Sequence, residues 1–207
     1  MEILRSGKLR PCMPLWQATG YVLIIGLVGL NDGTLLAAAY ARFVGDTKLR
    51  SIILRSVDHG KTWKYISNVA VGDTDSSSGP EGFAEPDLVV LPDGKLLYFM
   101  RTGGGKGFPL ALAESTDNGL SWKNLRSIAA RGVWPTGVLL ENGVVGVFTG
   151  RPGNWIQFSA NYGQDWVGWY EFDSTSPSCD CTHYNGTGAE YTAGCLLQTN
   201  RQGRLHS

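Results

Sequence analysis

A glutamate and an arginine are placed symmetrically about one Asp-Gly turn. Position 93, the first residue of the pair Asp93-Gly94, is the midpoint between Glu85 and Arg101. The apolar residues on both sides of this turn predict a β-hairpin, so Glu85 and Arg101 should face each other at its open end. A carboxylate would then meet a guanidinium, whose planar fork binds carboxylates through two hydrogen bonds and stays charged at every relevant pH.

Further candidates occupy similar positions in other segments. Arg42 and Arg151 each follow the Gly of a predicted turn at nearly the distance at which Arg101 follows its own. Both are therefore expected to project from the ends of equivalent strands. Tyr191 precedes another apolar segment, and Asp46 follows Arg42 in a loop that contains Gly and Lys. These residues add one phenol, one carboxylate and two guanidinium groups to the candidate chemistry.

Two alternating motifs predict the strands that must hold these residues. The first is an apolar strand, a turn ending in Gly and a second apolar strand; it occurs at 30–36, 91–97, 140–145 and from 196 onward. The second, Ser-x-Asp-x-Gly-x-Thr-Trp and its variants, occurs at 56–63, 115–122 and 159–166. In the second motif a short Asp or Asn side chain accepts hydrogen bonds from its own turn, and Trp packs on the neighbouring layer. One copy of each motif makes four antiparallel strands, and the first-motif glycines lie 49 to 61 residues apart, a spacing typical of propeller blades.

The second motif resembles the Asp-box, or BNR repeat, of the sialidase (neuraminidase) superfamily. This resemblance implies an all-β fold, a six-bladed β-propeller with four-stranded antiparallel blades. Residues 18–207 would form a single partial propeller of about three and a half blades, after an N-terminal extension at 1–17. The chain is therefore expected to be an N-terminal part of a longer protein, with open blade edges through which it could self-associate.

The same resemblance implies roles for the candidate residues. Arg101 and Arg151 resemble the arginines that bind the substrate carboxylate in this family. Tyr191 lies where sialidases carry their nucleophile, and Glu85 resembles the glutamate that acts as its base. A neutral phenol approaches an anionic sugar without like-charge repulsion. Asp46 resembles the acid/base aspartate of a family loop.

Three arginines bind the substrate carboxylate in this family, and the first of them is absent from this sequence. Val22 stands where the family has its first arginine, and Arg42 would replace that arginine in part. The activity implied is hydrolysis of terminal sialic acid from glycans, without a cofactor or a metal ion. A sialylated or other acidic glycan is the expected partner.

Alternatives to this function come from the same residues. Asp-boxes also occur in propellers without catalysis, so a module that binds glycans or proteins is one alternative, and a glycosidase for another acidic sugar is a second. For Glu85 and Arg101 the simpler interpretation is a cross-strand ion pair. For Asp46 it is an ordinary turn.

Composition excludes other classes of protein. Lys plus Arg and Asp plus Glu number 18 each, with no basic cluster, so a nucleic-acid partner is not expected. The longest uncharged apolar run, residues 21–30, has about half the length of a membrane-spanning helix, and no clear signal peptide indicates a location. Cys179, Cys181 and His183 lie close together but lack a second pair, so no metal site is predicted.

Overall fold

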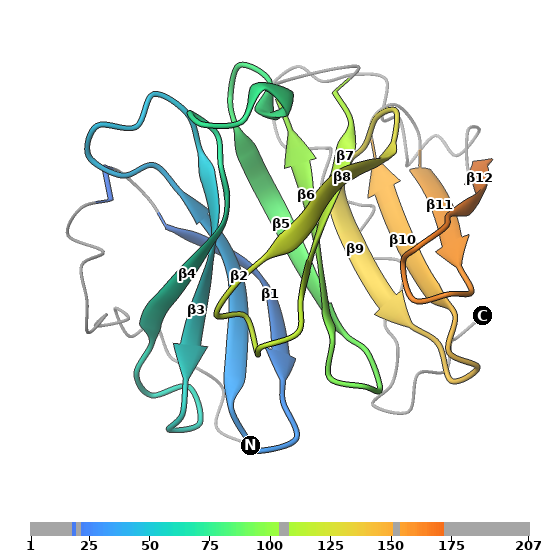
Figure 1. The fold of residues 1–207 in the computed structure, drawn as a ribbon, viewed down its shortest axis with the longest axis horizontal. Coiled ribbons are helices and arrows are strands. Elements are labelled where there is room, and N and C mark those ends of the chain that lie inside the picture. Colours follow the sequence, from blue (N-terminus) through green and yellow to red (C-terminus); the bar gives the residue numbers. More distant parts are fainter. Residues whose placement is uncertain (1–17, 20–21, 104–107, 151–153, 172–207) are drawn as a thin grey trace, which may run out of the picture.

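Three four-stranded antiparallel sheets make up the computed structural model, which describes residues 18–19, 22–103, 108–150 and 154–171 (Figure 1). Each sheet uses four consecutive strands in chain order. The first contains β1 (Leu23–Gly29), β2 (Leu35–Ala41), β3 (Arg50–Ser56) and β4 (Lys64–Val71). The second contains β5 (Phe83–Val90), β6 (Leu96–Thr102), β7 (Leu110–Ser115) and β8 (Lys123–Ala129). The third contains β9 (Val133–Leu139), β10 (Val145–Gly150), β11 (Asn154–Ser159) and β12 (Val167–Glu171).

The four-stranded antiparallel blades predicted from the two motifs are thus confirmed. Gly33, Gly94 and Gly143 turn the first hairpin of each blade with φ of 82°, 82° and 83°, a region that glycine enters without steric cost. A short 3-10 helix, Ser76–Ser78, follows β4. The fourth hairpin, expected from residue 196 onward, lies outside the described residues.

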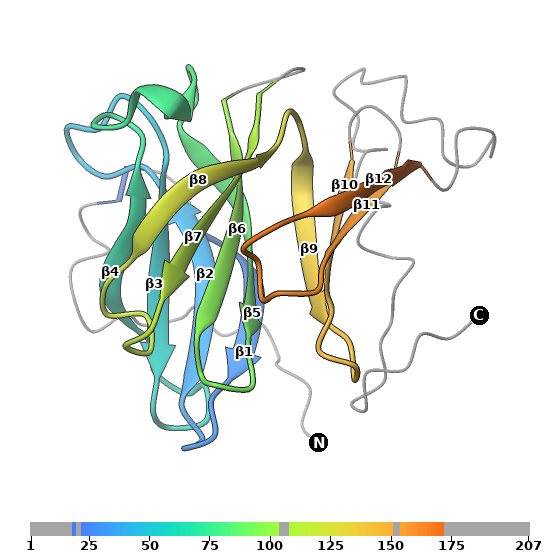
Figure 2. The same ribbon diagram turned by 45° about the vertical axis from the view of Figure 1, so that its right-hand side comes forward.

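The middle strands of the second blade are buried because the first and third blades cover both of their faces. Every residue of β6, β7 and β10 is buried. Tyr98 of β6 is fully buried, and its hydroxyl lies 3.0 Å from the carbonyl oxygen of Ala39 and 3.1 Å from that of Ile52, both in the first blade. Between the second and third blades, Phe99 shares an apolar cluster with Val147. Figure 2 shows the third blade beside the second.

Each Ser-x-Asp or Ser-x-Asn turn is held by its own side chains. In the first, Asp58 accepts hydrogen bonds from the backbone N–H of Thr62 at 2.8 Å and from its hydroxyl at 2.6 Å. These bonds lower the pKa of Asp58 to about 2. In the third turn, Asn161 takes the place of the aspartate, and its Oδ1 accepts the N–H of Asp165 at 2.9 Å.

The second of these turns also connects two blades. The hydroxyl of Ser67, on β4, donates to the carbonyl of Gly119 at 2.5 Å and accepts the indole N–H of Trp122 at 3.1 Å. We expect Ser67→Ala to lower the free energy of unfolding by about 1–3 kcal/mol, because it leaves two partly buried polar groups without partners. Urea unfolding measures this loss, with the exposed Ser77→Ala as control. Equal midpoints for the two variants would contradict this role.

Candidate functional site

The first strands of the three blades form the wall of a pocket. β1 packs beside β5, and β5 packs beside β9, with all three strands beginning at the same end of the structure (Figure 1). A pocket of about 340 Å³ lies between them, a volume within the range of small-ligand sites. Its lining residues are Ile24, Ile25, Asp87, Trp134, Pro135 and Thr136.

The predicted contact between Glu85 and Arg101 is present beside this pocket. Arg101 Nε lies 2.9 Å from Glu85 Oε2. The backbone register differs from the expectation, because Ala84 rather than Glu85 pairs with Arg101. A β-bulge between Ala84 and Asp87 causes the shift, since Pro86 has no N–H with which to continue the ladder. The Glu85 side chain reaches the arginine from this bulge.

Glu85 is held in an uncommon backbone conformation. Its φ is 48°, and that of Trp134 is 49°, a region that residues other than glycine seldom occupy. Glu85 Oε2 accepts the backbone N–H of Trp134 at 3.0 Å, which ties β5 to β9. Strained residues of this kind cluster at functional sites. The backbone of Trp134 and the carboxylate of Glu85 are therefore held by the same contact.

Arg101 is bound by more than one acidic group. Its Nη1 lies 2.9 Å from Glu81 Oε2 and donates to the carbonyl of Gly103 at 2.5 Å. The Arg101 side chain is only 10% exposed. Two carboxylates, those of Glu81 and Glu85, thus compensate one guanidinium at this place.

Asp87 belongs to the site and is missed by the sequence analysis. It lines the pocket, and its Oδ2 accepts the N–H of Gly137 at 2.7 Å. Burial raises the pKa of Asp87 to about 6, although hydrogen bonds from the N–H groups of Gly137 and Leu88 oppose this rise. A second charged residue in β5, directly before the apolar run 88–91, is the signal that could have identified it.

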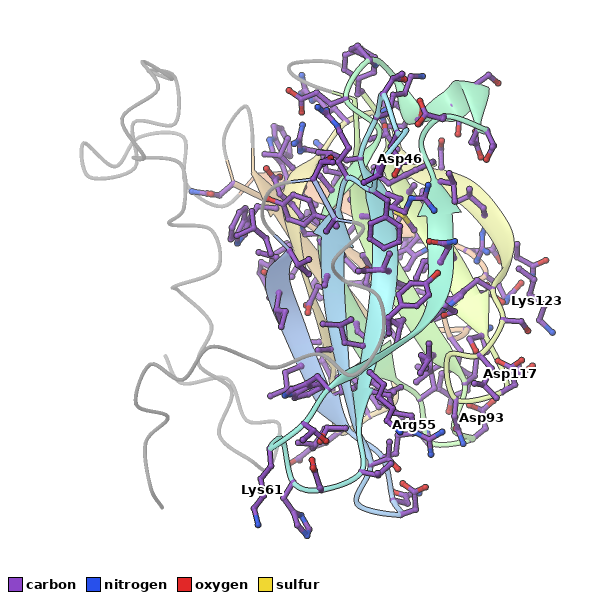
Figure 3. All side chains as sticks on the ribbon, turned by 90° about the vertical axis from the view of Figure 1, so that its left-hand side faces the viewer. Asp46, Arg55, Lys61, Asp93, Asp117 and Lys123 are labelled. Carbon is purple, nitrogen blue, oxygen red and sulfur yellow. The ribbon has the colours of Figure 1, made fainter. Side chains whose placement is uncertain are left out.

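Asp46 and Arg42 lie near the end of β2. Both oxygens of Asp46 contact Arg50: Nε donates to Oδ2 at 2.7 Å, and Nη2 contacts Oδ1. Oδ2 also accepts the N–H of Phe43 at 2.8 Å. Figure 3 shows Asp46 at one end of the strands and Lys61 at the other. Arg42 is exposed, and the catalytic role of Asp46 and the binding role of Arg42 stay predictions.

Other expected residues lie outside the described part of the chain or in its core. Tyr191, Arg151 and the 179–183 segment lie outside the described residues. Val22 is partly buried and packs against the apolar cluster of the first blade. Among the described residues, no group of three His, Cys, Asp or Glu side chains could hold a metal ion, and no helix is long and apolar enough to span a membrane.

Comparison with known proteins identifies the fold. No protein-family model and no curated protein matches the sequence. A solved structure from Dyadobacter fermentans, of unknown function, is 24% identical over 68% of this chain and 38% of that chain, with a TM-score of 0.59. The GH93 α-L-arabinofuranosidase of Fusarium graminearum, in complex with arabinobiose, is 20% identical over 75% and 50%, with a TM-score of 0.58. The chain has a β-propeller fold.

A third similar structure is the Hadza microbial sialidase Hz136, which is 20% identical over 72% of this chain and 30% of that chain, with a TM-score of 0.54. The two named enzymes are propeller glycoside hydrolases that act on different sugars. This chain spans between 30% and 50% of the length of the three structures. At these identities the likeness establishes the fold, and the chemistry has to be argued from the site.

Proposed function

We propose that this chain carries the sugar-binding pocket of a glycoside hydrolase. The observation that supports it most is a pair of carboxylates, Glu85 and Asp87, that are both tied to β9 where the three first strands form a pocket. Two carboxyl groups beside a glycosidic bond can supply the acid and the base that its hydrolysis requires. The likeness to propeller glycoside hydrolases agrees with this function.

Terminal sialic acid is the first candidate substrate, as the resemblance of the motifs implies. Arg101, Arg151 and Arg42 would bind the carboxylate of the sugar. Tyr191 would attack the anomeric carbon, with Glu85 as its base. In this mechanism Asp46 would supply the proton for the leaving group.

A neutral sugar is the second candidate, and the surroundings of Arg101 favour it. Its guanidinium is already compensated by Glu81 and Glu85, and the pocket-lining residues that the structure describes include no cation. An anionic sugar would meet a site of net negative charge, which disfavours binding. The Fusarium graminearum enzyme, which resembles this chain in fold, was solved with arabinobiose, a neutral disaccharide.

Hydrolysis of two glycosides by the purified chain tests the proposal. The substrates are the 4-methylumbelliferyl glycosides of sialic acid and of α-L-arabinofuranose. We expect turnover of one of them, and Glu85→Gln should lower kcat/KM by about 10²–10⁴-fold, because the base or its charge is lost. Glu141→Gln, in an exposed turn, is the matched control and should behave as the wild type.

Each outcome distinguishes the alternatives. Release from the sialic acid glycoside supports the first candidate, and release from the arabinofuranoside supports the second. If a folded sample binds one of these glycosides without hydrolysing it, the chain is a non-catalytic glycan-binding propeller. The glycoside hydrolase proposal is then wrong.

A further inference from the structure

Among the described residues that line the pocket, Asp87 is the only ionisable one. Ile24 and Ile25 come from β1, and Trp134, Pro135 and Thr136 from β9. A ligand that enters the pocket would therefore meet one carboxyl group in a mostly apolar surrounding. Such a group can both hydrogen-bond a sugar and exchange a proton with it.

The two oxygens of Asp87 face two different strands. Oδ2 accepts the N–H of Gly137 on β9, which fixes the orientation of the carboxyl group. Oδ1 lies beside β1 at Gly26, where an added Cβ would come within 2.5 Å of it. Glycine at position 26 thus leaves the space that this oxygen occupies.

The surroundings of Asp87 favour its protonated form. On β1 and β9, the segments beside it carry no ionisable side chain. On β6, burial raises the pKa of Tyr98 far above its usual value, so its hydroxyl stays neutral. On β5, Glu85 is a carboxylate paired with Arg101. Since burial also raises the pKa of Asp87 to about 6, part of the population holds a proton at neutral pH.

We propose that Asp87 is the proton donor to the glycosidic oxygen. The O–H bond of Asp87 breaks, and its proton passes to that oxygen. The oxygen keeps the electron pair of its bond to the anomeric carbon and departs as a hydroxyl group. A water molecule then adds to the anomeric carbon and returns a proton to the Asp87 carboxylate. The net reaction consumes one water and yields the free sugar and the hydroxyl compound that leaves.

This assignment rests on the proposed function and changes one role within it. The leaving-group proton comes from Asp87 instead of Asp46, both of whose oxygens contact Arg50. Asp87 instead lies in the pocket wall, where a glycosidic oxygen could approach it. A general acid must lie within hydrogen-bond reach of the atom that it protonates.

The test compares leaving groups that differ in their need for a proton. Asp87→Asn keeps an oxygen for the N–H of Gly137, so the fold should persist. The substrates are phenyl and 2,4-dinitrophenyl glycosides of whichever sugar, sialic acid or α-L-arabinofuranose, the wild type hydrolyses. We expect kcat/KM to fall about 10²–10⁴-fold for the phenyl glycoside and less than about tenfold for the dinitrophenyl glycoside, whose phenolate departs without protonation. Asp93→Asn, in the exposed turn after β5, is the control.

Two kinds of failure can be told apart. If Asp87→Asn loses the same factor on both glycosides, or none on either, Asp87 is not the donor and the proposed function remains. If the folded wild type hydrolyses neither sugar, the proposed function is wrong and this assignment falls with it. A further expected result is that the wild-type rate declines as the pH rises through about 6, where Asp87 loses its proton, and that this decline is absent from the variant.

Discussion

Replacing Arg101 with methionine should lower both the stability of the protein and its action on glycosides. The largely buried guanidinium lies between Glu81 and Glu85, and methionine fills part of the space without the charge. Removing one partner of a buried ion pair costs about 3–5 kcal/mol, because the other charge is left uncompensated. Glu85 would also lose one of the contacts that position it. We expect a loss of about 3 kcal/mol in urea unfolding and at least about a hundredfold in kcat/KM.

Two comparisons check this explanation. Lys61→Met removes an exposed cation at the opposite end of the strands (Figure 3) and should leave both quantities nearly unchanged. In the double variant Arg101→Met with Glu85→Gln, the stability loss should be smaller than the sum of the two single losses, because the largely buried carboxylate of Glu85 is no longer left without its partner and the carboxylate of Glu81 is about half exposed. If Arg101→Met unfolds at the same urea concentration as Lys61→Met, the ion pairs are not important for stability.

Replacing Glu114 with glutamine should also lower the stability of the protein strongly. This buried side chain lies 3.1 Å from Lys95 Nζ and 2.7 Å from Arg126 Nη2. Asn124 donates a third contact, at 3.2 Å. The substitution would leave two cations with only a neutral partner. We expect the free energy of unfolding to fall by about 3 kcal/mol at neutral pH.

The effect of Glu114→Gln should extend to the third blade. Arg126 also contacts the carbonyl oxygen of Gly163, and Lys95 Nζ lies 3.4 Å from that of Tyr162. Glu114 therefore orients the two cations that hold the turn of the third blade against the second. The loss of stability should be accompanied by increased hydrogen exchange in this turn.

The pH dependence of stability provides an independent test of the role of Glu114. Burial alone would raise the pKa of Glu114, but hydrogen bonds from Arg126, Lys95 and Asn124 outweigh it and hold the pKa below its usual value. The folded state then binds fewer protons than the unfolded state, so this residue stabilises the fold above about pH 4.5, and the contribution is lost as the pH falls further. Urea unfolding between about pH 3 and pH 7 should show this loss in the wild type and less of it in Glu114→Gln. If the free energy of unfolding falls equally with pH in the wild type and in Glu114→Gln, this role of Glu114 is wrong. Glu141→Gln is the control.

The blades could be predicted from the sequence because their signals are local. An Asp-Gly or Asn-Gly turn between apolar segments determines a hairpin within a few residues. The contact between Glu85 and Arg101 follows from the same symmetry, although the bulge at Pro86 moved the register by one residue. A proline inside a strand does not by itself reveal where the ladder resumes.

The remainder of the site depends on contacts between distant residues. Asp87 became part of it through the N–H of Gly137 and through the space left at Gly26, neither of which belongs to its own hairpin. The contact of Asp46 with Arg50 could not be read from a loop that lacks regular spacing. Long-range packing, rather than any local motif, decides which carboxyl groups reach the pocket.

A crystal structure of the chain with the monosaccharide that it releases is the most direct test of the central claim. The account predicts that the sugar ring lies in the pocket between β1, β5 and β9, within hydrogen-bond distance of Asp87 and against Trp134. A sugar bound only at the turns around Asp58 and Asp117, with the pocket empty, would contradict it.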